Sequence, residues 1–178
     1  NIARAQREAD AALRYSKIST LSQQEITDSM TAVALAFRSA DDTPMPFKDI
    51  FDTITTFEGR FGVLGAEILK FTADLAPLGK ELGFTQEQLS GLGAVAQSRS
   101  GKSGTVLAEQ LGRILPSLQA QQDKLYELFA LNNGTEGAVV DLMSKFGEGD
   151  IPGVLEVLVE NYRKMDATQQ NQLATIVG

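Results

Sequence analysis

Glycine and proline divide the apolar residues of this chain into short helical stripes, and this pattern constrains its fold more than any other feature. Apolar residues recur at steps of three and four nearly everywhere, which is typical of α-helices that bury one face. Pro77 and Pro116 fall inside two of the stripes, where a proline removes a backbone donor and kinks or breaks a helix. The pattern predicts an all-α protein without strands, in which about eight or nine kinked helices form hairpins or an irregular array.

Three stripes have heptad-like spacing and supply the residues that we expect to pack helix against helix. The first contains Leu64, Ile68, Phe71, Leu75, Leu78 and Leu82. The second contains Leu107, Leu111, Ile114, Leu118, Leu125 and Leu128, with Pro116 breaking it in the middle. The third contains Ile151, Leu155, Leu158, Tyr162 and Met165. Because each stripe is short and interrupted, packing within the chain is favoured over self-association as a coiled coil, but spacing alone leaves both open.

Capping residues mark several helix starts. Ser22–Glu25 and Thr85–Gln88 match the capping box, in which the first and fourth residues bond each other's backbone N–H groups. Asp150 is a good N-cap, and Pro152 suits the first turn of the helix after it. The segment DDTPMP, Asp41 to Pro46, stops the preceding helix. These signals predict helices that begin near residues 23, 86 and 151.

Two segments permit more than one interpretation. The run ITTF, Ile54 to Phe57, is compatible with a strand, but the flanking apolar spacing favours a helix. Gly59, Gly62 and Gly65 form either a loose turn or a small-residue face between two helices. The turn is favoured because glycine costs about 1 kcal/mol in a helix interior.

Composition excludes several classes of function. The chain has 178 residues, of which 43% are hydrophobic, and it has no Cys and no His, so it lacks thiols, imidazole bases and the usual zinc ligands. Its net charge of −7 argues against general nucleic-acid binding. The longest uncharged stretch, Ala167 to Gly178, is shorter than the about 20 apolar residues of a membrane span. No metal or cofactor is expected.

One motif permits an enzymatic interpretation. Ala96 to Ser103, AQSRSGKS, fits the phosphate-loop spacing if alanine replaces the first glycine. Such a loop follows a β-strand, whereas this segment follows helical spacing, so a Gly/Ser turn between two helices is favoured. Glu156 and Glu160, one helical turn apart, are interpreted as solvated surface and not as a catalytic pair. No catalytic residue is assigned, and the chain is expected not to be an enzyme.

Four stretches, taken in order, share a pattern of Leu, Ala and Gly. They are FDTITTFEGRFGVLGAEILKFTADLAPLGKELGF from Phe51, TQEQLSGLGAVAQS from Thr85, GKSGTVLAEQLGRILPSL from Gly101 and GDIPGVLEVLVENYRKMDATQQNQLATIVG from Gly149. Their order and spacing resemble the core region of phage tail tape measure proteins, from Ser22 to Gly178. On this basis we expect a single helical domain over 1–178 that is a fragment of a longer tape measure protein. Within it, 1–21 would form an N-terminal helix and linker, and 22–178 the core-like region.

The resemblance implies a structural role in a phage or prophage tail. Tape measure proteins set tail length, template assembly of the tail tube and leave the tail at genome ejection. The implied partners are copies of the chain itself, commonly three, together with tail tube proteins, tail tip proteins and assembly chaperones. The implied location is the tail lumen or tip of the virion, and the host cytoplasm during assembly. Nucleic acid is not an expected specific partner, and no membrane span is expected in this segment.

Two other classes of function stay open from the sequence. The first is a helical partner-binding module, such as a bacterial adaptor or secreted effector domain. The second is a nucleotide-using enzyme built on Gly101, Lys102 and Ser103. Appreciable β-structure before that loop would favour the enzyme.

Overall fold

The computed structural model describes residues 6, 9–10, 12–13, 20–130 and 136–177, and the fold in these residues is all-α, as predicted. They contain nine numbered helices and no strand. The helices are α2 (Gln23–Ala36), α3 (Phe47–Phe61), α4 (Gly65–Glu81), α5 (Gln86–Ser100), α6 (Gly104–Ala120), α7 (Gln122–Ala130), α8 (Glu136–Glu148), α9 (Ile151–Tyr162) and α10 (Ala167–Val177). The N-terminal helix and linker expected over 1–21 lie largely outside the described residues, although residues 6, 9–10 and 12–13 are helical.

The chain divides into two compact units. Unit 1 comprises the described residues of 1–81 and 85–109, and unit 2 those of 82–84 and 110–178. The division therefore falls inside α6, between Glu109 and Gln110. The expectation of one domain over 1–178 stays a prediction, because two compact units can still fold as one cooperative domain.

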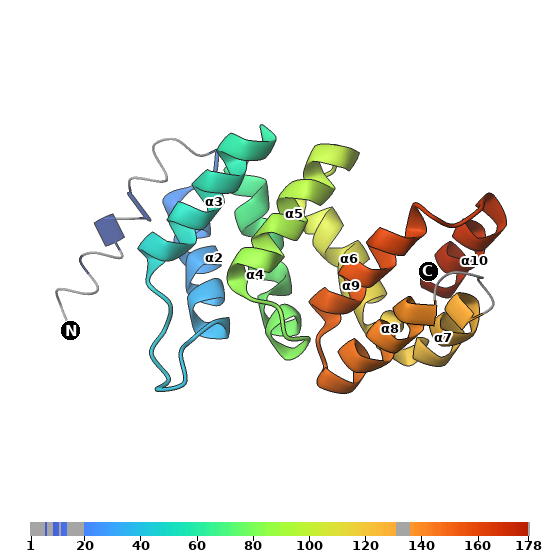
Figure 1. Ribbon diagram of the computed structural model, residues 1–178. Helices are drawn as coiled ribbons and strands as arrows, with labels where there is room; N and C mark the ends of the chain where they lie inside the picture. Colours follow the sequence, from blue (N-terminus) through green and yellow to red (C-terminus); the bar gives the residue numbers. More distant parts are fainter. Residues whose placement is uncertain (1–5, 7–8, 11, 14–19, 131–135, 178) are drawn as a thin grey trace. The chain divides into compact units, whose positions relative to one another are not determined.

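Helix α4 lies at the centre of unit 1, where it packs against α2, α3 and α5 (Figure 1). Most of its buried side chains are large and apolar, and several are almost fully enclosed. The side chains of unit 1 with exposed fractions of 1% or less include Ile26, Met30, Ile50, Ile54, Ile68, Leu69, Phe71 and Leu89. These residues come from α2, α3, α4 and α5, so the four helices share one core.

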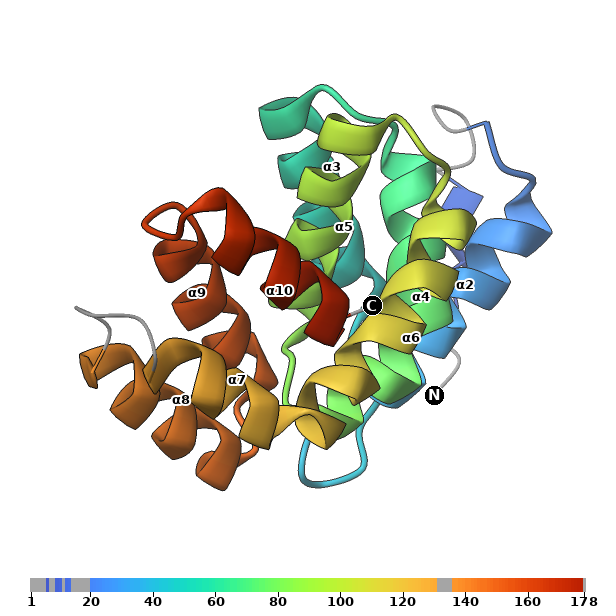
Figure 2. The ribbon, with the colours of Figure 1, turned by 90° about the vertical axis from the view of Figure 1, so that its right-hand side faces the viewer.

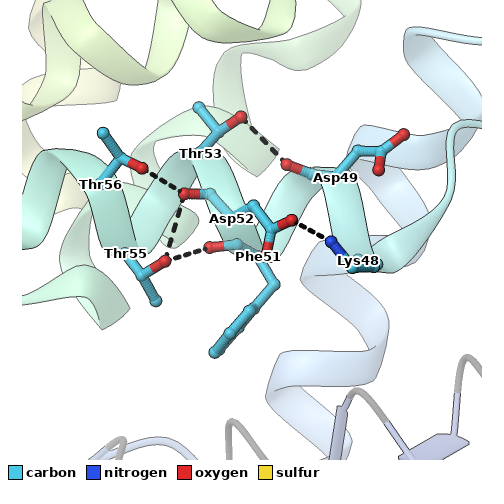
Figure 3. A network of polar contacts seen from close by, with 7 residues as sticks. All are labelled: Lys48, Asp49, Phe51, Asp52, Thr53, Thr55 and Thr56. Carbon is cyan, nitrogen blue, oxygen red and sulfur yellow. Dashed lines mark hydrogen bonds and ion pairs between the residues drawn. The ribbon is translucent and has the colours of Figure 1, made fainter.

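The threonine-rich helix α3 shows why ITTF is helical and not a strand (Figure 3). The Thr53 hydroxyl donates to the Asp49 carbonyl at 3.0 Å, and the Thr56 hydroxyl donates to the Asp52 carbonyl at 2.7 Å. The Thr55 hydroxyl contacts the carbonyls of Phe51 and Asp52. These bonds return to the helix's own backbone, so the hydroxyls are satisfied without strand pairing. Lys48 adds an ion pair to Asp52 one turn later.

In unit 2, α8 packs against both α7 and α9 (Figure 2). Leu125 and Phe129 of α7, Leu142 of α8 and Val154 of α9 each have an exposed fraction of 0%. The rings of Tyr126 and Phe146 meet edge to face with centroids 5.9 Å apart, which adds a directional contact between α7 and α8. Helix α10 rests on α7 and buries one residue, Leu173.

The predicted helix starts are confirmed. Both capping boxes are complete, at Ser22–Glu25 and at Thr85–Gln88. Asp150 caps α9, and Pro152 lies in its first turn. A further capping box begins α10, where Asp166 and Gln169 each accept the other's backbone N–H at 2.9 Å. The sequence D-x-x-Q at this point is the local signal for this further cap.

Of the three glycines expected to form a turn, only Gly62 lies between α3 and α4, so the prediction holds there and is wrong for Gly59, which lies within α3. Gly62 has a φ of 64° and caps the C-terminus of α3, where its N–H donates to the Glu58 carbonyl, and Gly65 is the first residue of α4. The Gly65 N–H donates to the Glu58 side chain at 3.1 Å. The turn therefore uses a left-handed backbone that glycine adopts without a steric penalty.

The helix break expected at Pro116 is wrong, and Pro77 breaks no helix either. α4 continues through Pro77 to Glu81, and α6 continues through Pro116 to Ala120. A proline has the φ angle of a helix and removes one N–H donor, so the bonds on either side can maintain a continuous helix when its apolar face is packed. Leu115 and Leu118, which flank Pro116, have an exposed fraction of 0%.

Candidate functional site

The seventeen residues of the three stripes fall into three groups. Eleven are buried within the chain: Ile68, Phe71, Leu75, Leu82, Leu107, Leu118, Leu125, Leu128, Ile151, Leu158 and Met165. Four are half-buried: Leu78, Leu111, Ile114 and Leu155. Leu64, which precedes α4, is 55% exposed, and Tyr162 is 45% exposed. The buried residues are committed to the chain's own core, so a surface for partners has to be sought elsewhere.

Helices α4 and α5 approach each other closely at two glycines. A Cβ atom added to Gly93 of α5 would lie 2.3 Å from Cδ1 of Phe71 on α4. About one turn earlier on α5, a Cβ on Gly79 of α4 would lie 2.9 Å from Cδ2 of Leu89 on α5. The absence of these two side chains allows the large residues opposite to approach the helix backbone.

A chain of hydrogen bonds crosses the same interface. The Gln86 amide nitrogen donates to the Ser90 hydroxyl at 3.0 Å, and the Thr72 hydroxyl donates to the Ile68 carbonyl at 2.8 Å. The Ser90 and Thr72 oxygens are 3.0 Å apart. Since the Thr72 proton is used, Ser90 donates to Thr72. All three polar side chains are buried, so this chain of bonds fixes how α4 and α5 pair.

The segment Gly101–Ser103 connects α5 to α6 and does not follow a strand. Gly101 ends α5 with a φ of 66°, and α6 begins at Gly104. The first N–H groups of a helix attract anions, but here the Gly104 N–H donates to the Glu67 carboxylate at 2.6 Å. A Cβ on Gly104 would lie 2.1 Å from the Glu67 carbonyl oxygen. An internal carboxylate therefore occupies the place where a phosphate would bind, and the segment is a helix–helix turn.

The turn between α8 and α9 contains a partly buried ion pair. Lys145 Nζ lies 2.8 Å from Asp150 Oδ2, and the Gly153 N–H donates to Asp150 Oδ1 at 2.9 Å. These contacts, the Lys145 bond first, lower the pKa of the Asp150 carboxyl below its ordinary value. A Cβ on Gly153 would lie 2.4 Å from Asp150 Oδ2, so a glycine is needed for the pair to close. The ion pair therefore stabilises the start of α9.

Hydrogen bonds hold helix α10 near both of its ends. The Gln170 side chain donates to the carbonyls of Tyr162 and Met165, and the Ser117 hydroxyl donates to the Val177 carbonyl at 2.9 Å. Between these points, α10 and α9 leave an apolar groove, which we call the α9/α10 groove. It is lined by Leu158, Val159, Tyr162, Arg163, Leu173, Ala174 and Val177. Val159 and Tyr162 are 60% and 45% exposed, so the groove opens to solvent.

A second exposed apolar surface lies on α8. Val140 and Met143, three residues apart on one face of the helix, are 65% and 56% exposed. We call these two residues the α8 patch. Val140, Met143 and Val159 lie outside the three predicted stripes, so the stripes do not predict them. Leu142 and Phe146, which are buried, lie on the opposite side of α8 from Val140.

A family model describing phage-related minor tail proteins matches residues 2–178. The chain belongs to this family. No curated protein and no solved structure matches the chain. A match over nearly the whole chain, together with the all-helical fold, makes this family member a structural component of a phage tail that contacts other tail components.

Two further observations bear on what this minor tail protein contains. No helix in the described residues is long and apolar enough to cross a bilayer. The same residues hold no group of three or more acidic side chains placed to bind a metal ion.

Proposed function

We propose that the chain is a helical domain of a phage tail tape measure protein. The match to the minor tail protein family over residues 2–178 carries this proposal. The order of the four Leu/Ala/Gly stretches supports the finer assignment, and the all-α fold is compatible with it. In this role the domain lies in the tail lumen or at the tail tip, contributes to tail length and tube assembly, and leaves the tail at genome ejection. It acts by binding and not by catalysis.

Tail length tests this proposal directly. The coding sequence for residues 22–178 is deleted in frame from the phage that carries it, and tails are measured by electron microscopy. We expect tails of altered length, with a change of at most about 235 Å, the length of the deleted residues as one continuous helix. A phage with the same segment recoded synonymously is the control. Tails of unchanged length would contradict a contribution to length.

We further propose that copies of the chain associate with one another and that they form a trimer. Supporting this, the chain retains exposed apolar surfaces on α8 and α9 after its own core is complete. Sedimentation velocity of the 178-residue chain over a wide concentration range tests the point. A species of three chains is expected at high concentration, and a monomer throughout would contradict it.

A further inference from the structure

The turn between α9 and α10, residues 163–166, contains no residue that prevents a helix from continuing. Four of the turns between other helices contain a glycine with a positive φ: Gly62, Gly83, Gly101 and Gly149. Residues 163–166 are Arg, Lys, Met and Asp, without glycine or proline, and none of them has a positive φ. Arg163, which follows α9, has a φ of −69° and a ψ of −19°, in the right-handed helical region. Since Arg, Lys and Met are good helix formers, this segment is able to join α9 and α10 as one helix.

Helix α10 is packed less completely than the two helices beside it. It buries one residue, Leu173, whereas α7 buries three residues and α9 buries six. In addition to the α9/α10 groove, a second groove opens between α10 and α7, with Lys124, Glu127 and Thr175 among the residues that line it. A helix with few buried contacts opens at a lower free energy than the core around it.

The contacts of α10 are of two kinds. Burial of Leu173 and the hydrogen bond from Ser117 join α10 to other helices of unit 2, and the α10 of any copy of the chain is able to make them. The capping box at Asp166 and the two hydrogen bonds from Gln170 lie in or next to the turn itself. Straightening the turn therefore loses only the second kind, provided that an α10 from another copy restores the first.

We propose that α10 exchanges between copies of the chain. In the exchanged form, α9 and α10 join as one helix over 151–177, and the α10 segment of one copy takes the place that α10 occupies in the next copy. This inference rests on the proposed self-association and names the element that carries it. Each copy gives one helix and receives one, so three copies are able to close into a ring.

Cysteine cross-linking detects the exchange, because the chain contains no cysteine of its own. The Ser117 hydroxyl lies 2.9 Å from the Val177 carbonyl oxygen, so these two positions lie close together wherever an α10 is in place. One preparation carries Ser117→Cys and another carries Val177→Cys, and the two are mixed at high concentration before mild oxidation.

The control mixture pairs Val177→Cys with Gln119→Cys, an exposed position on α6. We expect mixed disulfide dimers to form at least tenfold faster from Ser117→Cys than from Gln119→Cys, because only an exchanged α10 brings Val177 of one copy next to Ser117 of another. A mixed rate no higher than that of the control mixture overturns the proposal.

Ala167→Pro, added to the Val177→Cys chain, tests whether the turn straightens. Ala167 is exposed and is the first residue of α10, where proline is tolerated because a helix offers its first N–H no partner. In the joined helix the same proline lies in the interior and breaks it, so mixed dimer formation should fall at least tenfold. Ala167→Ser is the matched control and should leave the rate nearly unchanged. A rate that Ala167→Pro leaves unchanged overturns the proposal.

Asp166→Ala in the Val177→Cys chain changes the rate in the opposite direction. This substitution removes the cap oxygen of α10 and places a better helix former in the turn, so mixed dimers should form several-fold faster. A slower rate overturns the proposal.

Sedimentation velocity of the unmodified chain separates this inference from the proposed self-association. If the chain associates but mixed dimers form no faster than in the control mixture, the exchange of α10 alone is wrong. If the chain stays monomeric at every concentration and no mixed dimers form, both proposals are wrong.

Discussion

Gly93 on α5 faces the base of the Phe71 ring on α4, where a Cβ atom would lie 2.3 Å from Cδ1 and 2.8 Å from Cγ. Phe71 is 1% exposed and cannot swing aside without displacing its neighbours. We expect Gly93→Ala to lower the free energy of unfolding by about 1–2 kcal/mol, since overpacking exceeds the gain in helix propensity. Urea denaturation followed by circular dichroism measures the change.

Gly59→Ala is the matched control for this substitution. Gly59 also lies within a helix, α3, and a Cβ there meets no atom within 4 Å. The same chemical change should therefore raise the free energy of unfolding by about 0.5–1 kcal/mol. Equal effects at the two glycines would show that the contact between Phe71 and Gly93 is not as close as the structure has it.

The Asp150 carboxylate makes the stability of unit 2 depend on pH. Its pKa is lowered in the folded protein, first by the Lys145 bond and then by the Gly153 N–H. A lowered folded pKa contributes stability above the unfolded value of about 3.9, and this stability is lost as pH falls through the folded pKa. Asp150→Ala should cost about 1 kcal/mol at pH 7, and the difference from the unmodified chain should shrink as the pH falls below about 4.

Thermal unfolding of the two chains at pH 7 and pH 3 measures this difference. Asp150→Asn is the control, because asparagine keeps an N-cap oxygen for α9 but loses the charge. It should cost less than Asp150→Ala at pH 7. A cost of Asp150→Ala that is the same at both pH values would contradict a role for the charged form.

At the scale of helices, the buried hydrogen-bond chain should couple α4 to α5. Thr72→Val leaves the Ser90 hydroxyl proton without its acceptor, and Ser90→Ala leaves the Gln86 donor without its partner. Each single substitution should cost about 1–3 kcal/mol, because it leaves a buried polar group unpaired. The double variant should cost less than the sum by about 0.5–3 kcal/mol, as urea denaturation of all four proteins would show. Strict additivity would mean that the two hydroxyls act independently.

The helices themselves were largely predictable, because their signals are local. Capping boxes, glycine ends and apolar steps of three and four depend on residues within one or two turns, and α2, α5 and α9 begin where those signals place them. Pro116 was misjudged, because the penalty of a proline is local while the packing of Leu115 and Leu118 that offsets it is not. Packing depends on partners far away in the chain.

The buried faces were predicted too narrowly for the same reason. The heptad stripe of α4 includes Ile68, Phe71 and Leu75, but α4 also buries Leu69 and Ala76, because it packs against three other helices. Packing against one helix requires two apolar positions per heptad, whereas a helix that packs against several neighbours requires a wider apolar face. The contact between Glu67 and Gly104 joins residues that are far apart in the sequence, and the α9/α10 groove is formed by two helices. The spacing of residues within one helix cannot predict either feature.

At the scale of the whole molecule, the division inside α6 predicts that the two units respond separately to a loss of core packing. Leu142 in α8 and Leu69 in α4 are both 0% exposed, so truncation of either to alanine should cost about 2–5 kcal/mol. Hydrogen exchange followed by mass spectrometry on the complete chain reports where the cost falls. Leu142→Ala should speed exchange in α7, α8 and α9 and leave α2 to α5 unchanged, and Leu69→Ala should do the reverse. If either substitution speeds exchange equally in both units, the chain unfolds as one cooperative domain, as its sequence predicts, and α6 transmits stability from one unit to the other.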